Sequence, residues 1–129
     1  MRLPDLNNYP SILEFNQINE IYEIVLNQFD RAKQFGDKNK LVSYLIEVIH
    51  SQGYRPDEGL RKDLASRVLE YLANWWDEAN AELCGSITIL SANINIPDAL
   101  IFLEEKKKTT KHVEIKKEIV DTINEIMSN

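Results

Sequence analysis

Apolar residues recur every three or four positions along most of the chain, which is the spacing of one face of an α-helix. The recurrence falls into six segments separated by short breaks. In chain order, the six stripes consist of Ile18, Ile21, Tyr22, Val25, Phe29 and Ala32; Leu41, Val42, Leu45, Val48 and Ile49; Leu60, Leu64, Val68, Tyr71, Leu72 and Trp75; Ala79, Leu83, Ile87, Leu90 and Ile94; Ala99, Leu100 and Leu103; and Ile115, Ile119, Val120, Ile123 and Ile126. Each stripe predicts one amphipathic helix.

Residues that favour helix ends stand at the breaks between these segments. Gly36 follows the first stripe, where a glycine commonly ends a helix. Pro97 stands where the first residue of the fifth helix is expected, with Asp98 beside it at the positive end of the helix dipole. The residues expected to cap helix starts through their side chains are Asn16, Asp37, Asp57 and Asp77.

The fourth segment allows two interpretations. Residues 86–89 alternate between polar and apolar as a β-strand does, and Gly85 weakens a helix by about 1 kcal/mol. However, a strand here has no second strand to pair with elsewhere in the chain. We therefore predict a helix, with Ile87 and Leu90 on its buried side.

Six helices joined by short connections make an all-α domain in which consecutive helices are antiparallel. Two architectures meet this description: a compact bundle, and a compact α-solenoid of stacked helical hairpins. The whole chain, at 129 residues, has the length of one domain. Residues 1–15 contain Pro4 and Pro10 and predict an extended lead-in, which Leu13 and Phe15 anchor on the helices.

Residues 93–126 carry short patterns that can be compared with a known repeat. One is Pro-Asp-Ala-Leu at residues 97–100, and the others, on the next predicted helix, are Ile115-Lys116 with Ile119, and Thr122-Ile123-Asn124 with Ile126. This two-helix unit resembles a HEAT-like repeat of the short bacterial type. Lysine, isoleucine and asparagine stand where that family favours arginine, alanine and glycine. The resemblance implies stacked two-helix units with a curved binding surface.

The net charge of −6 is concentrated in the middle of the chain. Residues 1–67 have a net charge of −1 and residues 106–129 a net charge of +2, whereas residues 68–105 contain acids and no lysine or arginine. These acids are Glu70, Asp77, Glu78, Glu82, Asp98, Glu104 and Glu105. Such a segment repels phosphate backbones and attracts basic partners, although acids also keep small proteins in solution. We expect a protein partner with a basic surface, and no nucleic acid.

Residues that could carry catalysis or bind a metal are few. Cys84 has no second cysteine to pair with and lies among apolar and acidic residues, so we expect a buried thiol and not a nucleophile. His50 and His112 are far apart, and neither is followed three or four positions later by another ligand. No glycine-rich phosphate loop is present. The sequence therefore predicts no enzyme, no cofactor and no metal site.

The remaining features bear on location. A single free cysteine is typical of a reducing compartment, which predicts a cytoplasmic protein. The N-terminal residues lack the apolar centre of a signal peptide, and no run approaches the roughly 20 apolar residues of a membrane-spanning helix. We therefore expect no membrane association.

The most informative cluster lies where the third helix is expected to end. Trp75 continues the apolar stripe, so Trp76 is rotated away from it, next to Asp77 and Glu78. Large aromatic residues beside acids on a surface are enriched at protein interfaces. The alternative is that Trp76 packs beneath a loop. The sequence predicts a partner-binding site formed by Trp76, Asp77, Glu78 and Glu82.

Two functions agree with these predictions. The first is a small acidic bacterial immunity or antitoxin-like protein that neutralises a basic toxin, a role that the HEAT-like resemblance implies. The second is a helical-repeat scaffold or adaptor without a toxin partner. Both are non-enzymatic protein-binding modules, and the oligomeric state is left open.

Overall fold

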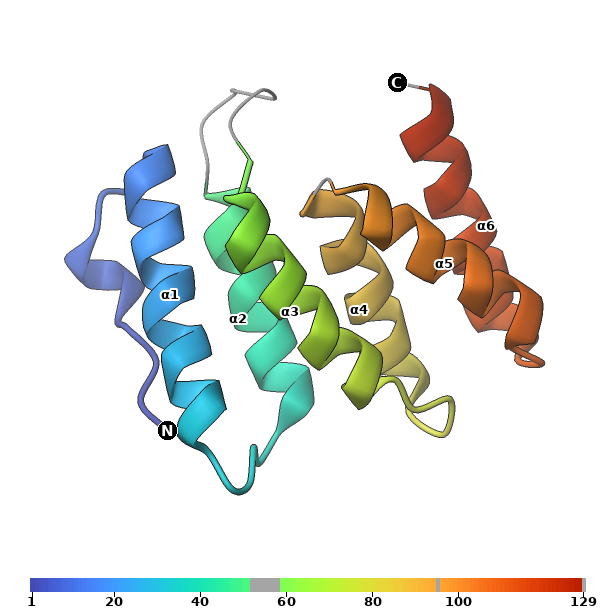
Figure 1. Ribbon diagram of the computed structural model, residues 1–129, viewed down its shortest axis with the longest axis horizontal. Helices are drawn as coiled ribbons and strands as arrows, with labels where there is room; N and C mark the ends of the chain where they lie inside the picture. Colours follow the sequence, from blue (N-terminus) through green and yellow to red (C-terminus); the bar gives the residue numbers. More distant parts are fainter. Residues whose placement is uncertain (52–58, 95, 129) are drawn as a thin grey trace.

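In the part of the chain that the structure describes, six α-helices follow one another and pair into three antiparallel hairpins (Figure 1). The computed structural model describes residues 1–51, 59–94 and 96–128. Within these ranges the elements are the 3-10 helix η1 (Leu6–Asn8) and the helices α1 (Phe15–Arg31), α2 (Lys38–His50), α3 (Lys62–Trp75), α4 (Ala81–Asn93), α5 (Pro97–Thr109) and α6 (Val113–Ser128). No β-strand occurs in these ranges, which confirms the predicted all-α fold and the helix predicted across residues 86–89.

The three hairpins stack side by side and form two layers of helices. One layer contains α1, α3 and α5 and the other α2, α4 and α6, because each helix packs against the helix two places further along the chain. Asn39 Nδ2 of α2 lies 3.5 Å from Glu82 Oε2 of α4, and His50 Nε2 lies 3.3 Å from Asn93 Nδ2. Both contacts join residues 43 positions apart, so α2 and α4 run parallel. Of the two architectures that the sequence allowed, the helices therefore adopt the stack of helical hairpins and not the bundle.

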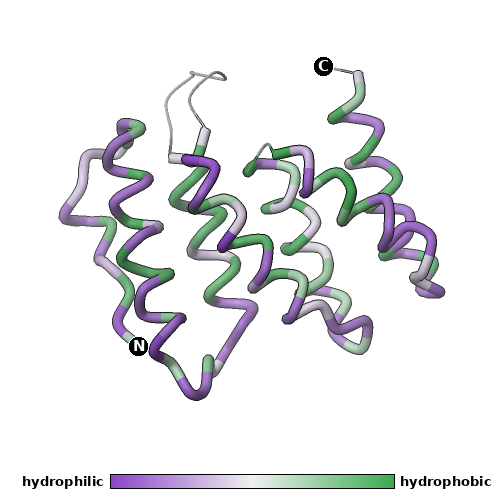
Figure 2. The backbone as a smooth tube through the Cα atoms, in the orientation of Figure 1, coloured by the Kyte–Doolittle hydropathy of each residue, from purple (hydrophilic) through white to green (hydrophobic). Residues whose placement is uncertain are grey.

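Among the described residues, one hydrophobic core runs between the layers and includes residues of α1 to α6. Ile87 and Leu90 of α4 have no exposed surface, as predicted, and Tyr22 of α1 is equally buried. The Tyr22 hydroxyl donates a hydrogen bond to the carbonyl of Leu45 in α2, which satisfies the one polar atom that this ring carries into the core. Figure 2 shows the pattern that produces this core, because hydrophobic and hydrophilic residues alternate along each helix.

The lead-in before α1 lies along the outer side of the first hairpin (Figure 1). Leu13 is buried, as predicted, and its N–H donates a hydrogen bond to the Ser51 carbonyl at 2.8 Å. The Tyr44 hydroxyl donates to the Pro4 carbonyl at 2.7 Å. The prediction of an extended lead-in over residues 1–15 is wrong in two places, because the 3-10 helix η1 interrupts it at Leu6–Asn8 and because the half-buried Phe15 is already the first residue of α1.

The ends of α1 differ from those predicted. Asn16 is not the cap, because Glu14 occupies the cap position of α1. The Glu14 N–H donates to Gln17 Oε1 at 3.0 Å, as in a capping box. The sequence had not predicted Gln17 as part of the cap. The helix ends at Arg31, well before Gly36. Gly36 has φ of +67° and turns the link towards α2, a conformation that glycine adopts without strain.

Two of the other predicted helix starts are confirmed, and one is wrong. Asp37 caps α2, because its carboxylate accepts a hydrogen bond from the N–H three residues later. Pro97 is the first residue of α5, as predicted. The prediction of Asp77 as the cap of the fourth helix is wrong, because Asn80 caps α4 and Asp77 lies in the preceding link. Asp57 lies outside the described residues.

Candidate protein-binding surface

Trp76 lies at the end of α3, where it packs against α5. Trp75 is buried, as predicted, whereas Trp76 is half-buried. The Trp76 ring meets the Phe102 ring edge-on with 5.8 Å between centroids, and the Lys106 ammonium lies 5.6 Å from the Trp76 centroid. The indole N–H points to Glu78 Oε2 at 3.5 Å. Trp76 therefore joins α3 to α5, and part of its surface is covered within the chain.

Glu78 lies in the link between α3 and α4 and reaches the end of α5. Its Oε1 accepts a hydrogen bond from the hydroxyl of Thr110, a residue that is itself buried. This bond is the largest cause of a Glu78 pKa below the usual value, and the contact with Trp76 lowers the pKa further. Glu78 is therefore a carboxylate already engaged by its own chain.

Asp77 and Glu82 face other surroundings. Asp77 is exposed, and its carboxylate accepts a hydrogen bond from the N–H two residues later at 3.0 Å. Glu82 is exposed in the first turn of α4, beside Asn39 of α2. The structure thus brings Trp76 and Glu78 into contact and places Glu82 between the starts of α2 and α6.

Glu82 belongs to a hollow of about 620 Å³ between α4 and α6. The residues that line this hollow are Ala81, Glu82, Glu114, Ile115, Lys117, Glu118 and Asp121. They contribute four carboxylates and one ammonium group, so the hollow is strongly negative. We call it the acidic hollow.

The acids of α6 reach this hollow because they share one flank of their helix. Glu114, Glu118 and Asp121 follow one another at intervals of four and three residues, which places them in line along the helix. Gly85 of α4 allows this flank to approach closely, since a β-carbon at residue 85 would lie 2.8 Å from Glu118 Oε2. Sequence reasoning missed these residues because it summed the charges of residues 106–129. A helical wheel of residues 113–128 would have shown that the three acids share one side of the helix.

The outward side of α4 extends this surface beyond the hollow. Glu82, Ile89 and Asn93 follow at intervals of seven and four residues, so they lie on one face of the helix. Ile89 is 44% exposed, and Asn93 contacts His50 of α2. The surface of this layer therefore has acids at one end, an exposed isoleucine in the middle, and Asn93 with His50 at the other end.

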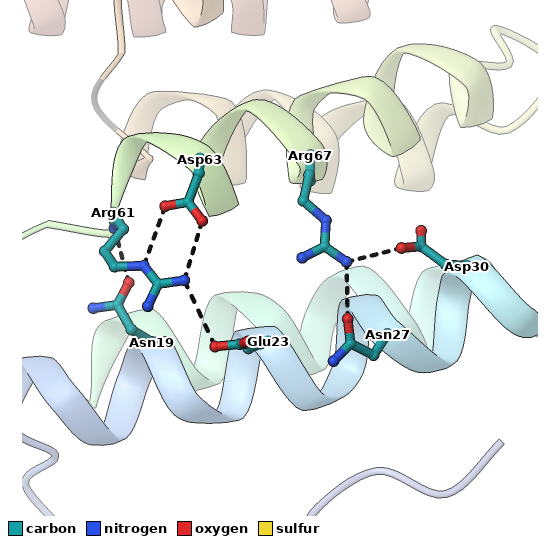
Figure 3. Close-up of polar contacts among 7 residues, drawn as sticks. All are labelled: Asn19, Glu23, Asn27, Asp30, Arg61, Asp63 and Arg67. Carbon is teal, nitrogen blue, oxygen red and sulfur yellow. Dashed lines mark hydrogen bonds and ion pairs between the residues drawn. The ribbon is translucent and has the colours of Figure 1, made fainter.

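The other layer carries a row of polar contacts that joins α1 to α3 (Figure 3). Arg61, immediately before α3, lies 3.6 Å from Glu23 of α1 and 3.1 Å from Asp63. Its backbone N–H donates to Asn19 Oδ1 of α1 at 2.8 Å. This end of the row ties the start of α3 to the first half of α1.

The row continues with Arg67, whose guanidinium lies 2.9 Å from Asp30 and 3.2 Å from Asn27. The Tyr71 hydroxyl also donates to Asp30, and this bond is the main cause of an Asp30 pKa below its usual value. A hollow of about 360 Å³ beside these groups is lined by Asp30, Arg67, Glu70, Tyr71 and Asn74. Because the two arginines are matched to acids of the same chain, we assign this row to holding α1 against α3.

The residues considered for chemistry occupy structural positions. Cys84 is buried, which raises the pKa of its thiol as expected, and its Sγ lies 3.2 Å from the Asp77 carbonyl. The Ile115 N–H donates to His112 Nδ1 at 3.3 Å, so this histidine caps α6. In the described part of the chain, no three His, Cys, Asp or Glu side chains are grouped so that they could hold a metal ion. None of the helices in this part is long and apolar enough to cross a bilayer.

No protein-family model, no curated protein and no solved structure matches this chain. The assignment of function therefore rests on the two-layer stack and on its acidic hollow.

Proposed function

We propose that this chain is a non-enzymatic protein-binding module and that the layer of α2, α4 and α6 binds a basic segment of another protein. The acidic hollow carries this proposal. Its carboxylates are exposed, whereas Glu78 is held by Thr110 and the acids of the α1–α3 row are held by arginines. Free carboxylates around a depression attract lysine and arginine side chains over a distance of about 10 Å at ordinary salt.

The exposed isoleucine beside the hollow supports the same function. Ile89 lies two helical turns from Glu82 on the outward side of α4. A partner that places basic groups in the hollow can therefore cover an apolar side chain with the adjoining part of its surface. In such an interface the charges speed association, and the covered apolar group slows dissociation.

We propose further that the chain is a HEAT-like repeat protein of the immunity or antitoxin type, acting in the cytoplasm on a basic toxin. The separation of 43 residues between matched contacts of α2 and α4 supports the first part, since HEAT and armadillo repeats have periods of about 40 to 47 residues. The net charge of −6 supports the proposed action on a basic toxin. A gene position directly behind a large toxin gene would favour this role over a scaffold or adaptor.

Affinity capture from the native cell, followed by mass spectrometry, tests the binding function. The double variant Glu82→Lys/Glu118→Lys reverses two charges of the acidic hollow. The control Glu20→Lys/Glu105→Lys makes the same change of charge at exposed positions of α1 and α5. We expect a protein with a basic surface to be captured by the parent and by the control, and to be lost from the hollow variant. Equal capture by both variants would refute the proposal.

A further inference from the structure

The two ends of the helical stack differ in what covers them. At the first hairpin, the lead-in packs Leu3, Leu6 and Tyr9 against the core. At the last hairpin, α6 is the outermost helix and no described segment lies beyond it (Figure 1). Val113 and Met127 of this helix are 81% and 70% exposed. Exposed apolar residues that lie together on one surface mark sites of interaction.

Three apolar residues of α6 form one line, of which Val113 and Met127 are exposed and Val120 is half-buried. Val113, Val120 and Met127 are spaced by seven residues, which is close to two full turns of an α-helix. Ile119 faces the core, and the acidic flank that contains Glu118 faces α4. The line therefore lies on the side of α6 that faces away from α4.

Lysines border this line. Lys116 lies three residues from Val113 on the same flank and is exposed, and Lys108 is exposed at the end of α5. Lys107 is paired with Glu104 at 2.9 Å. This side of α6 is thus apolar with exposed lysines near it, although the chain as a whole has a net charge of −6.

We propose that the open side of α6 binds an amphipathic helix of another protein whose polar flanks are acidic. A seven-residue spacing of apolar side chains is the pattern by which two helices pack along a seam. Acidic flanks on the incoming helix would meet Lys116 and Lys108. A second copy of this chain is a poorer occupant, because a two-fold contact sets this positively charged surface against itself. This second surface is separate from the acidic hollow and does not depend on it.

A designed helical peptide tests this proposal. The probe has leucine at the two seam positions of each heptad and glutamate at the flanking positions, and a matched peptide has lysine in place of glutamate. Repulsion between like flanks keeps either peptide from pairing with itself. We expect the full chain to bind the glutamate peptide at least about tenfold more tightly than the lysine peptide, as measured by fluorescence anisotropy at low salt.

Variants assign the binding to α6. Val113→Asp/Met127→Asp should weaken glutamate-peptide binding at least about tenfold, and Lys116→Glu should reduce the preference between the two peptides. These positions are exposed, so circular dichroism should remain parental. Glu118→Lys, on the other flank of α6, serves as the matched control and should bind the glutamate peptide no more weakly than the parent. Equal affinity for both peptides, or binding that survives Val113→Asp/Met127→Asp, would overturn the proposal. A dimer in sedimentation that this double variant dissolves would assign the surface to a second copy instead.

Discussion

Glu118 of α6 lies so close to Gly85 of α4 that an added β-carbon at residue 85 would come within 2.8 Å of its Oε2. The obstructing group is the far end of an exposed, flexible side chain, which can turn away at little cost. Alanine is favoured over glycine inside a helix by about 1 kcal/mol. We therefore expect Gly85→Ala to leave the free energy of unfolding unchanged or to raise it by up to about 1 kcal/mol, as measured by urea denaturation.

The same substitution separates stability from binding. Because Gly85→Ala pushes the Glu118 carboxylate out of its place in the acidic hollow, a basic partner should bind the variant more weakly even though the fold is intact. Glu118→Ala combined with Gly85→Ala should show the full helix-propensity gain. A loss of stability greater than about 1 kcal/mol for Gly85→Ala alone would show that Glu118 cannot move.

Neighbouring residues of α4 offer a test of the core. Leu90 has no exposed surface, so Leu90→Ala should lower the free energy of unfolding by about 2 to 5 kcal/mol through lost burial and a new cavity. Ile89 is 44% exposed, so Ile89→Ala should cost clearly less. Chemical denaturation of both variants measures the difference. Similar losses at the two positions would contradict the orientation of α4.

The contact between Asp30 and Tyr71 predicts a dependence of stability on pH. The Tyr71 hydroxyl and Arg67 lower the pKa of Asp30, so its contribution to stability is present above the unfolded value near 3.9 and is lost as pH falls through the lower, folded value. We expect Asp30→Asn to be less stable than the parent at neutral pH, and the gap to narrow below about pH 4. Denaturation midpoints from neutral to acidic pH measure this gap. A difference in stability that does not change with pH would show that the ionised form of Asp30 does not stabilise the fold.

Removing the Tyr71 hydroxyl tests whether it is the main cause of the lowered pKa of Asp30. Burial, followed by the contact with Asp30, raises the pKa of Tyr71 to about 12, so the hydroxyl is a donor throughout the neutral range. In Tyr71→Phe the pKa of Asp30 should move up towards its usual value, because the largest lowering interaction is gone. The carboxyl carbon of Asp30 reports this directly in an NMR titration.

The apolar spacing of the chain was sufficient to predict most of the buried positions, although Ala79 of the fourth stripe is exposed in the link before α4. Trp75 and Leu90 illustrate this, because burial of a helix face follows from periodicity alone. Helix ends were less predictable. Asn16 and Asp77 both have good capping side chains, yet Glu14 and Asn80 stand at the caps, because the turn that precedes each helix decides which side chain meets a free N–H.

The acidic hollow could not be predicted from the charge of a segment. Glu114, Glu118 and Asp121 lie among six lysines, so their contribution disappears when the charges of residues 106–129 are summed. A helical wheel shows that these acids share one flank. It does not show that this flank faces α4, because that depends on the direction in which the hairpins stack. The direction of stacking likewise decides that Trp76 contacts Phe102 of α5, whereas Glu82 lies beside Asn39 of α2.

Charge reversal at Glu78 and at Glu82 distinguishes the site predicted from the sequence from the acidic hollow. Glu82 is exposed and has only a long contact with Asn39, so Glu82→Lys should change stability by no more than about 0.5 kcal/mol. Glu78→Lys leaves the buried Thr110 hydroxyl without its acceptor, which should cost about 1 to 3 kcal/mol. Thermal unfolding measures both changes.

Kinetics with the captured partner complete this comparison. Glu82→Lys should slow association, and the slowing should shrink as salt rises, because screening weakens the attraction between the hollow and a basic surface. Glu78→Lys, studied well below its melting temperature, should leave association close to parental, since the Glu78 carboxylate is bound to Thr110 and does not line the hollow. If Glu78→Lys slows association as much as Glu82→Lys does while the fold stays intact, the partner contacts the end of α3 around Trp76, and the acidic hollow is not the centre of the interface.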